Sequence, residues 1–394
     1  DRTDREKLDR EVLDLEEQGL ELRLGAGYLE NLEADVVFRT PGMHPANPAL
    51  EALRRRGAAV TSEMEIFFQV CPCPVIAVTG SDGKTTTTTL LAEMLRAAGK
   101  TVWVGGNIGK PLLPEVGRMA PSDWAVVELS SFQLMDMDRS GHIAVVTNLA
   151  PNHLDVHKDM AEYVEAKEHV FAYQSEGDIL ILNRDHEITR SFAPGAPGQV
   201  PWFSRRERPE RGVFLEDGVI YRATPEGVRE IMAQRDILLP GLHNVENYMA
   251  AFAATDGLVG NAACVQVAHA FSGVPHRMER IRELNGITFI NDSIASSPTR
   301  TIAGLHALPK PPVIILGGHD KHIPFDTLGD EVCLHAKAAV VVGETAQRIA
   351  AAIRASKCYD PGKLLLVEAP DFRAAVETAY GLAQPGDIVT LSPA

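Results

Sequence analysis

The feature that most constrains the fold of this chain is a glycine-rich turn between an apolar stretch and an amphipathic segment. The apolar stretch, residues 75–78, is continuous, as is typical of a strand buried on both faces of a parallel sheet. The segment from Thr86 to Ala98 repeats leucines and a methionine at helical spacing, which predicts a helix. A turn that joins a strand to a helix in this way forms a cradle for phosphate, because its backbone N–H groups and the positive end of the helix dipole face the anion.

The turn also carries the side chains that phosphate binding requires. Lys84 adds a full positive charge, and the Thr85 hydroxyl is placed to bind a magnesium ion that accompanies the phosphates. The Gly-x-x-Gly-Lys-Thr spacing is two residues shorter than the standard Walker A pattern, so a plain loop is the alternative. The context of strand, turn and helix favours phosphate binding. The predicted phosphate-binding residues are Gly80, Ser81, Asp82, Gly83, Lys84, Thr85 and Thr86.

The length and charge of the chain exclude several classes of protein. Its 394 residues predict two or three domains. The net charge of −15 argues against broad binding to nucleic acid or to an anionic membrane. The sequence has no run of about 18 apolar residues that would predict a membrane span. The charged N-terminus lacks the apolar core of a signal peptide, and five scattered cysteines suit reduced thiols in a cytoplasm.

Three blocks of alternating helical and strand patterns predict an α/β fold with three domains, residues 1–70, 71–273 and 274–394. The first block lacks the strand, glycine turn and helix that normally open such a domain, so we expect either an unusual domain or one whose start is missing. The middle block predicts a parallel sheet covered on both faces, followed by an antiparallel hairpin at 213–222. The last block predicts a second doubly wound unit, truncated after a strand. The strands expected in the parallel sheets are 75–78, 124–129, 143–149, 179–182, 287–291, 313–316, 339–342, 364–367 and 388–391.

Polar side chains stand where several of these strands end. Glu128 ends a strand beside the phosphate turn, where such folds hold magnesium, although a helix cap or a surface charge is the alternative. Asp292 and Lys321 follow two strands of the last block, which therefore offers an acid and a base to one cleft. Three groups that would suit a second metal ion or a phosphate follow another strand of the middle block: His153, Asp155 and His157. The neighbouring phosphate turn favours magnesium over zinc there.

Four further residues each allow a structural and a functional interpretation. Lys167 lies in a predicted helix, and its pattern alone indicates a solvated lysine. Asn244 and Asn247 stand at the start of another helix, where amides either cap the helix or reach a nucleotide. Arg277 lies at the junction of the last two blocks, where it would brace the domains or clamp a γ-phosphate when they close.

Taken together, these segments resemble the Mur ligase family, in the order of the family and over nearly the whole chain. Many of the pieces recur in all Mur ligases and in folylpolyglutamate synthases. The Gly-Gly-Asn-Ile-Gly run at 105–109 and the Ser-Ser-Phe-Gln-Leu run at 130–134 point to the members that add D-glutamate to UDP-N-acetylmuramoyl-L-alanine. The resemblance implies an ATP-dependent amide ligation through an acyl phosphate, in cytoplasmic peptidoglycan precursor synthesis. The other matching pieces lie at 79–85, 153–155, 167, 243–247, 275–277, 290–293, 317–321 and 391–394.

The resemblance also implies a role for each candidate residue. Lys84 and the turn amides would bind the ATP phosphates, and Lys167 would be carbamylated, which turns a cation that repels metal into a group that binds it. The groups implied for magnesium are Thr85, Glu128, His153 and Lys167. The nucleotide would also meet Asn244, Asn247, Arg277 and Asp292. The sugar-peptide substrate would meet Asn107, Ser130 and Gln133, and the implied glutamate contacts are Ser296 and Lys321. The implied catalytic residues are Lys84, His153, Lys167 and Lys321.

The chain departs from the family pattern at both ends and after Asp292. Part of the uridine site is expected to be absent, as is the serine-containing segment that usually holds the glutamate side chain. Ile294 and Ser296 stand where some members carry lysine and threonine. The alternatives are a sister Mur ligase or a folylpolyglutamate synthase-like ligase, a small-molecule P-loop kinase, and an inactive nucleotide-binding fragment. We expect a monomer that neither binds nucleic acid nor inserts into a membrane.

Overall fold

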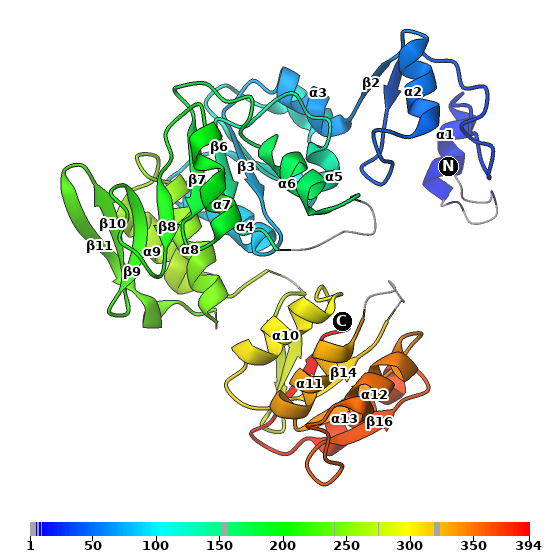
Figure 1. Cartoon of the computed structure of the whole chain (residues 1–394), viewed down its shortest axis with the longest axis vertical. Coiled ribbons are helices and arrows are strands. Elements are labelled where there is room, and N and C mark those ends of the chain that lie inside the picture. Colours follow the sequence, from blue (N-terminus) through cyan, green and yellow to red (C-terminus); the bar gives the residue numbers. More distant parts are fainter. Residues whose placement is uncertain are drawn as a thin grey trace. The chain divides into compact units, whose positions relative to one another are not determined.

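The computed structural model describes residues 5, 8, 10–150, 157–239, 241–274, 276–318 and 324–394. Figure 1 shows the helices and strands along the chain. Contacts between residues divide the chain into two compact units. The first unit comprises residues 1–82, 100–182 and 186–200, and the second comprises residues 83–99, 183–185 and 201–394. The boundary between residues 82 and 83 falls within the phosphate turn, so the turn continues covalently from one unit into the other.

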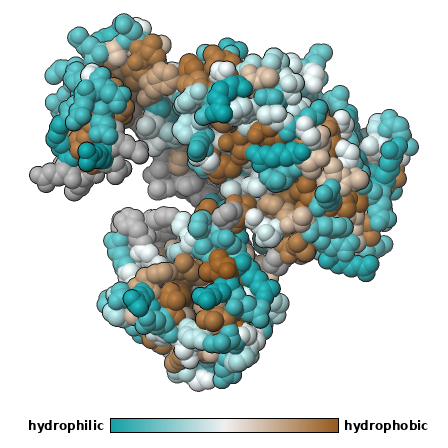
Figure 2. Space-filling view, turned by 180° about the vertical axis from the view of Figure 1, so that it is seen from behind, coloured by the Kyte–Doolittle hydropathy of each residue, from teal (hydrophilic) through white to brown (hydrophobic). Residues whose placement is uncertain are grey.

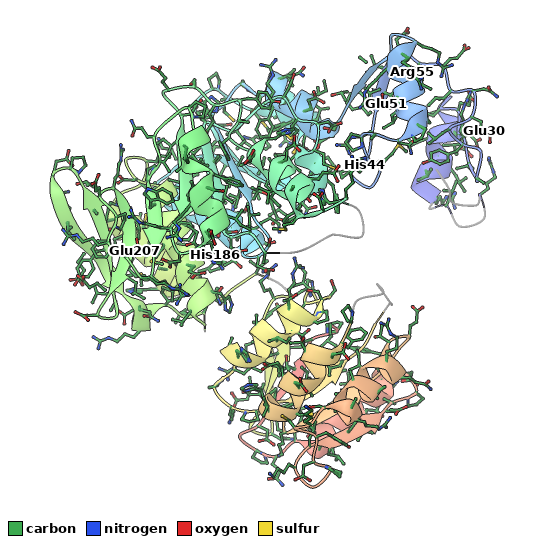
Figure 3. The ribbon with its side chains drawn as sticks, in the orientation of Figure 1. Glu30, His44, Glu51, Arg55, His186 and Glu207 are labelled. Atoms are coloured by element: carbon green, nitrogen blue, oxygen red, sulfur yellow. The ribbon has the colours of Figure 1, made fainter. Side chains whose placement is uncertain are left out.

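The N-terminal segment of the first unit alternates helices with two short parallel strands, as expected. Its elements are α1 (Arg10–Glu17), β1 (Val36–Phe38), α2 (Pro48–Arg55), β2 (Ala59–Thr61) and α3 (Glu63–Val70). The Asn47 side chain caps α2 by accepting a hydrogen bond from the N–H of Ala49. Leu50 and Leu53 form the buried face of α2, and Glu51 and Arg55 lie on its exposed face (Figure 3). The amphipathic spacing therefore decides which face of α2 packs inward.

The remainder of the first unit is built on parallel strands in the order β7-β6-β3-β5-β4. Most of these residues are buried, which explains why the strands are nearly continuous apolar runs. The expected strand at 143–149 ends earlier, at Val146, and β4 was not predicted because Gly105 and Gly106 weaken its pattern. The strands are β3 (Val75–Thr79), β4 (Val102–Gly106), β5 (Trp124–Glu128), β6 (Ile143–Val146) and β7 (Ile179–Asn183). The helices include η2 (Leu113–Arg118), α5 (Ser131–Leu134), α6 (Met160–Glu168), α7 (Glu187–Ser191) and η3 (Ala193–Gly195).

The second unit begins with α4 (Lys84–Ala97), which packs against α8 (Leu242–Ala254) and α9 (Asn261–Ala270). The predicted hairpin is present as β9 and β10, and the following strand extends it antiparallel. The antiparallel region comprises β9 (Gly212–Glu216), β10 (Val219–Thr224) and β11 (Gly227–Ala233), with β8 (Trp202–Ser204) parallel to β9 and η4 (Gln234–Asp236) after β11. The Glu216-Asp217-Gly218 turn fits the tight connection, because Asp217 and Gly218 both have positive φ.

The C-terminal part of the second unit is a six-stranded sheet in the order β12-β13-β17-β14-β15-β16. All neighbouring strands are parallel except β12 and β13. The edge strand β12 was not predicted, because it is rich in charged residues. The strands are β12 (Glu279–Leu284), β13 (Ile287–Asn291), β14 (Val313–Leu316), β15 (Ala338–Val341), β16 (Leu365–Glu368) and β17 (Ile388–Leu391). The helices are α10 (Pro298–Ala307), α11 (Asp326–His335), α12 (Ala346–Ala355) and α13 (Phe372–Leu382).

Alternate residues of β14 enter two separate hydrophobic cores. Ile314 and Leu316 pack in the core that includes Leu328 and Ile349, from α11 and α12. Val313 and Ile315 pack in the core that contains Ala375 and Ala379 of α13. Side chains that alternate along a strand point to opposite faces, so helices cover both faces of this sheet, as predicted for a doubly wound unit.

Hydrophilic residues cover much of the surface, and hydrophobic residues are grouped in patches between them (Figure 2). Exposed large apolar residues on the C-terminal part include Ile281, Leu334, Leu365 and Phe372. Among the helices formed by described residues, we find none with the length and apolar character needed to cross a bilayer.

Candidate active site

The first half of the phosphate turn is fixed by residues that directly follow β6. The Thr147 hydroxyl donates a hydrogen bond to the Asp82 carbonyl at 2.6 Å, and the N–H of Asp82 donates to the Asn148 side-chain oxygen at 3.0 Å. The N–H of Ser81 donates to the Asn148 carbonyl at 2.9 Å. A Cβ on Gly80 would lie only 1.9 Å from the Thr147 hydroxyl, so only glycine fits there. These contacts hold the turn in one shape and engage the N–H groups of Ser81 and Asp82 within the protein.

The side chain of Ser81 is buried in a hydrogen-bond network. Its hydroxyl lies 2.9 Å from the Tyr163 hydroxyl, and it donates to the Ala150 carbonyl at 2.9 Å. It also accepts a hydrogen bond from the N–H of Ala150 at 2.9 Å. Only 1% of Ser81 is exposed, so its hydroxyl stabilises the turn from the buried side.

Lys167 lies directly behind the same turn. Its ammonium donates hydrogen bonds to the Thr79 hydroxyl at 2.9 Å and to the Gly80 carbonyl at 3.0 Å. The Nζ atom also lies 5.2 Å from the centre of the Tyr163 ring, in cation–π contact. Only 2% of the residue is exposed, so the solvated lysine that the pattern indicated is wrong: tertiary packing draws this face of α6 inward. Burial of a cation is costly, and these two hydrogen bonds and the cation–π contact offset part of the lost hydration.

Glu128 is buried at the end of β5, opposite Val78 of β3. Its carboxylate accepts a hydrogen bond from the Asn107 side chain at 2.9 Å, and its carbonyl accepts one from the N–H of Asn107 at 2.7 Å. The alternatives of a surface charge and a helix cap are both excluded, because Ser130 is the residue that caps α5. A buried carboxylate at the carboxyl end of a parallel strand suits a divalent cation.

Ser130 and Gln133 form a capping box with each other. The N–H of Ser130 donates to the Gln133 side-chain oxygen at 3.0 Å, and the N–H of Gln133 donates to the Ser130 hydroxyl at 3.3 Å. The Ser130 hydroxyl also donates to the Gln133 oxygen at 2.9 Å. These two residues of the predicted substrate set are therefore held in a fixed relation at the start of α5.

In the second unit, the start of α4 packs against the two predicted asparagines of α8. Gly83 caps α4 in the left-handed conformation, with φ of 79°. A Cβ at Gly83 would lie 2.2 Å from the side-chain oxygen of Asn247. Asn247 also accepts a hydrogen bond from the Thr87 hydroxyl at 3.4 Å and donates to the Asn244 side-chain oxygen at 3.2 Å. Both asparagines are buried, so they support the phosphate turn rather than cap α8 at the surface.

Lys84, Thr85 and Thr86 form the first turn of α4, a helix of 14 residues. The positive end of the helix dipole lies at this turn and adds to the charge of Lys84. Thr85 and Thr86 are buried, at 8% and 1% exposure. The predicted combination of helix terminus, lysine and hydroxyl is therefore present in one helical turn.

In the C-terminal sheet, Asp292 is buried just after β13. It accepts hydrogen bonds from the N–H of Met278 at 3.1 Å and from the Ser392 hydroxyl at 3.0 Å. Burial raises the pKa of Asp292 to about 6, because removal from water disfavours its charged form more than these hydrogen bonds and the nearby arginines favour it. Ser296 lies further along the same loop, before α10, where its N–H donates to the Ile294 carbonyl at 2.9 Å.

The predicted Arg277 stands in an unusual stretch of backbone near Asp292. Its neighbours His276 and Met278 have φ values of 66° and 46°, in the left-handed region that non-glycine residues rarely occupy. The N–H of Arg277 donates to the Val274 carbonyl at 3.1 Å. Strained backbone of this kind is often found at functional positions, because the surrounding structure must hold it in place.

Two predicted residues, His153 and Lys321, lie outside the described residues, as does Asp155. His157, from the same predicted cluster, is described and is buried. Its Nε2 atom lies 2.9 Å from the Ser131 hydroxyl, and its ring stacks on Phe132. His157 therefore packs against the start of α5.

Two protein-family models and several named proteins are similar to this chain. The family model described as Mur ligase middle domain matches residues 78–255, and the model described as Mur ligase, glutamate ligase domain matches residues 276–394. A protein from Acetivibrio thermocellus named UDP-N-acetylmuramoylalanine–D-glutamate ligase is 47% identical over 398 residues, which cover 100% of this chain and 85% of the relative. A protein of the same name from Clostridium novyi is 47% identical over 397 residues, with the same coverage.

The chain belongs to the Mur ligase family. Solved structures of other ligases agree with its fold. MurF from Acinetobacter baumannii matches with a TM-score of 0.64 at 20% identity, over 85% of this chain and 78% of that one. A pseudomurein peptide ligase type C from Methanothermus fervidus matches with a TM-score of 0.62 at 18% identity, over 98% and 90% of the two chains. These matches confirm the predicted multi-domain α/β architecture of a Mur ligase.

Three residues that position the site of this Mur ligase were not predicted: Thr147, Asn148 and Tyr163. Thr147 and Asn148 directly follow β6, which lies beside β3, so their place at the same sheet edge was available from the strand pattern. Tyr163 is one helical turn from Lys167 on α6, but nothing in the sequence indicates that its hydroxyl reaches Ser81.

A cavity of about 630 Å³ lies in the second unit of this Mur ligase, beside the start of α8. Its lining includes the hairpin turn at Asp217 and Gly218, together with Arg235, Leu242 and Val245. It contains none of the predicted site residues.

Proposed function

We propose that this Mur ligase uses ATP to join D-glutamate to UDP-N-acetylmuramoyl-L-alanine through an amide bond. The observation that carries this proposal is 47% identity over the whole chain to relatives named UDP-N-acetylmuramoylalanine–D-glutamate ligase. The Gly-Gly-Asn-Ile-Gly and Ser-Ser-Phe-Gln-Leu runs, which distinguish this member of the family, support the same substrate pair. The reaction belongs to the synthesis of peptidoglycan precursors.

The residues of the phosphate turn fit ATP and magnesium. The backbone at Gly80 and Gly83 leaves no room for a Cβ, and the turn leads into a helix terminus that carries Lys84. We assign the ATP phosphates to Gly80–Thr86 and two magnesium ions to Thr85, Glu128, His153 and a carbamylated Lys167. Bound magnesium would neutralise the charge that accumulates on the phosphates and the reacting carboxylate.

The chemistry must activate a carboxylate before an amine can attack it. The L-alanyl carboxylate takes the γ-phosphoryl group of ATP, which releases ADP and gives an acyl phosphate. The D-glutamate amine then attacks the acyl carbon, phosphate leaves and the amine loses a proton. Lys84 stabilises the transferring phosphoryl group, and the buried surroundings of Lys167 and Glu128 limit access of water that would hydrolyse the intermediate.

The remaining predicted residues divide among the substrates. Asn244, Asn247, Arg277 and Asp292 serve the nucleotide. Asn107, Ser130 and Gln133 contact the sugar-peptide substrate, and Ser296 and Lys321 contact the incoming glutamate. We further propose the domain limits 1–70, 71–273 and 274–394, which the family matches at 78–255 and 276–394 support, and a cytoplasmic monomer.

An amino-acid panel tests the proposal. The protein is incubated with ATP, magnesium and UDP-N-acetylmuramoyl-L-alanine, and each amino acid is scored for phosphate release and for a new amide by mass spectrometry. We expect amide formation with D-glutamate and not with L-glutamate, L-lysine or diaminopimelate. A different preferred amino acid would indicate a sister ligase, a phosphoester would indicate a kinase, and no ADP at all would indicate a nucleotide-binding fragment.

Replacement of Lys84 by alanine gives a second test of the site. The Lys84→Ala variant should lose about a hundredfold or more of the phosphate-release rate, because it lacks the charge that stabilises the transferring phosphoryl group. Its circular dichroism spectrum should be unchanged. The matched control is Lys100→Ala, an exposed lysine just after the same helix, which should keep the wild-type rate. Undiminished turnover in Lys84→Ala would contradict the assignment.

A further inference from the structure

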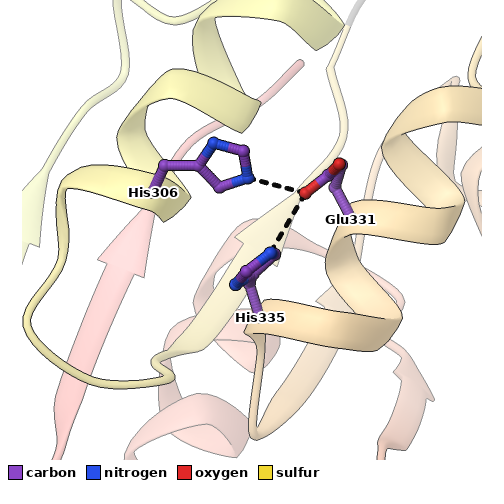
Figure 4. Close-up of side chains that lie close together, drawn as sticks. All are labelled: His306, Glu331 and His335. Atoms are coloured by element: carbon purple, nitrogen blue, oxygen red, sulfur yellow. Dashed lines mark hydrogen bonds and ion pairs between the residues drawn. The ribbon is translucent and has the colours of Figure 1, made fainter.

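A cluster of two histidines and a glutamate lies on the C-terminal sheet domain, outside the proposed active site (Figure 4). His306 is in the last turn of α10, and Glu331 and His335 are one helical turn apart on α11. The Glu331 Oε2 atom lies 2.6 Å from Nε2 of His306 and 3.2 Å from Nε2 of His335. One carboxylate oxygen is thus shared by two imidazole nitrogens from different helices.

The three side chains have the chemistry and spacing of a transition-metal site. Their candidate ligand atoms all lie within 4.8 Å of one another. A tetrahedral zinc ion with bonds of about 2.0–2.1 Å separates its ligand atoms by about 3.3 Å, so side-chain rotations suffice to admit the ion. The two imidazoles and one carboxylate favour zinc and its neighbours over magnesium, which prefers an all-oxygen shell. The side chains are 25–48% exposed, which leaves solvent access for a fourth ligand, water.

The nearby thiol of α11 does not belong to the cluster. Cys333 contacts the Ile353 carbonyl through its sulfur, at 3.7 Å, on the side of the helix that faces α12. The donor set is therefore two nitrogens and one oxygen. The alternative is a cluster without a metal, held by the His306–Glu331 hydrogen bond, by the His335–Glu331 ion pair and by the favourable position of both histidines at helix C-termini. An experiment must exclude this alternative.

We propose that His306, Glu331 and His335 bind a zinc ion, or another divalent transition-metal ion with the same ligand preference, that cross-links α10 to α11. Both helices begin after the loops that follow β13 and β14, so the cluster, in their last turns, lies away from the strand ends that carry Asp292. A helix of 10 residues is about 15 Å long, which separates the proposed ion from these strand ends. The ion would therefore stabilise the C-terminal domain without taking part in ligation.

Calorimetric titration of the full chain with zinc chloride tests the proposal. The wild type should bind one more equivalent of zinc than the double variant His306→Ala/His335→Ala. Glu331→Gln, which keeps a hydrogen-bond acceptor but loses the charge, should weaken binding at this site by about tenfold or more. His269→Ala, which removes an exposed histidine from the last turn of α9, is the matched control and should bind as the wild type does.

Thermal unfolding provides an independent readout. Zinc should raise the Tm of the wild type and of His269→Ala by a few degrees, and magnesium at the same concentration should not reproduce this shift. The double variant should fold with the wild-type circular dichroism spectrum and lose the zinc-dependent shift, because its substitutions are at partly exposed positions. Equal zinc stoichiometry in the wild type and a folded double variant would overturn the proposal, as would a wild type that binds no zinc.

Discussion

At the scale of single residues, the buried ionisable groups are the most informative part of the molecule. Lys167 is held by Thr79 and Gly80 at the back of the phosphate turn, and Asp292 is held by Met278 and Ser392 in the C-terminal sheet. Burial of each charge is costly, because the charged group leaves water. Both residues are therefore candidates for a functional role.

The proposed carbamylation of Lys167 leads to a chemical-rescue prediction. Lys167→Ala should lose about a hundredfold or more of the ligation rate, because the carbamate would no longer hold the second metal ion. Added formate or acetate should restore part of this rate by occupying the vacated space. The control is Lys158→Ala, an exposed lysine just before α6, which should retain full activity without additive. Full activity of Lys167→Ala without any carboxylate would remove the carbamate from the mechanism.

The raised pKa of Asp292 predicts a pH dependence of stability. Because burial raises its pKa from 3.8 to about 6, the folded state binds the proton more tightly than the unfolded state between these values. The free energy of unfolding should therefore fall by about 3 kcal/mol as the pH rises from 4 to 6, because the pKa of Asp292 is about two higher in the folded state than in the unfolded state. Above pH 6 it should level off. Urea unfolding of the wild type and of Asp292→Asn at several pH values measures this difference. Parallel pH profiles for the two proteins would contradict it.

At the scale of elements, the junction of the phosphate turn with α4 depends on close packing between Gly83 and α8. The left-handed backbone of Gly83 begins the helix, and Asn247 occupies the space that any Cβ would need. Asn247 then links the turn to Thr87 and Asn244. The hydrogen bond between Thr87 and Asn247 joins residues 160 positions apart. Packing against α8 therefore sets the orientation of α4, and with it the position of Lys84.

Gly83 must adopt a positive φ and must leave space for Asn247, and a double-mutant cycle can separate these two requirements. Gly99→Ala should cost about 1–2 kcal/mol of stability, since Gly99 also has positive φ but has nothing within 4 Å of its would-be Cβ. Gly83→Ala should cost distinctly more, because it adds a clash with Asn247 to the same backbone strain. Combination with Asn247→Ala should recover the excess and give a coupling energy, measured by urea unfolding. If Gly83→Ala and Gly99→Ala are equally destabilising, the proposed clash is absent.

At the scale of the whole molecule, Arg39 connects segments of the first unit that are far apart in sequence. Its side chain is fully buried, and its Nε atom donates to the Asp136 carboxylate at 2.8 Å. The same guanidinium donates to the carbonyl groups of Phe132 at 2.9 Å and of Met43 at 3.0 Å. One arginine therefore ties the segment after β1 to the residues that follow α5.

Loss of this arginine should weaken the link. Arg39→Ala should lower the free energy of unfolding by roughly 3 kcal/mol, because it removes the arginine that donates to the partly buried Asp136 and to three carbonyl groups. It should also increase the proteolytic cleavage of residues 36–70. Arg55→Ala is the matched control, since Arg55 is exposed and its Nε atom donates only within α2, to the Glu51 carbonyl at 3.3 Å. Similar unfolding curves and digestion patterns for the two variants would disprove the link.

The local sequence was sufficient to predict elements whose formation depends on a few neighbouring residues. The apolar run of β3, the glycines of the phosphate turn and the leucines of α4 each satisfy a rule that spans a few residues, so the strand, turn and helix were predictable. Parallel strands place their carboxyl ends at one edge, which made Glu128 a candidate as well. The strands β4 and β12 escaped prediction, because glycine and charge mask the pattern of an edge strand.

The tertiary structure alone decided which side chains support the site. Nothing near Lys167 in the sequence distinguishes it from a solvated lysine, yet its ammonium is buried against Thr79 and Gly80. Nothing near Asn148 in the sequence indicates that it accepts hydrogen bonds from N–H groups of the phosphate turn. The positions of His306 and His335 in the sequence likewise do not reveal that both contact Glu331. Such contacts join residues tens of positions apart, so they exist only once the strands and helices have packed, whereas the turn and its helix follow from the order of neighbouring residues.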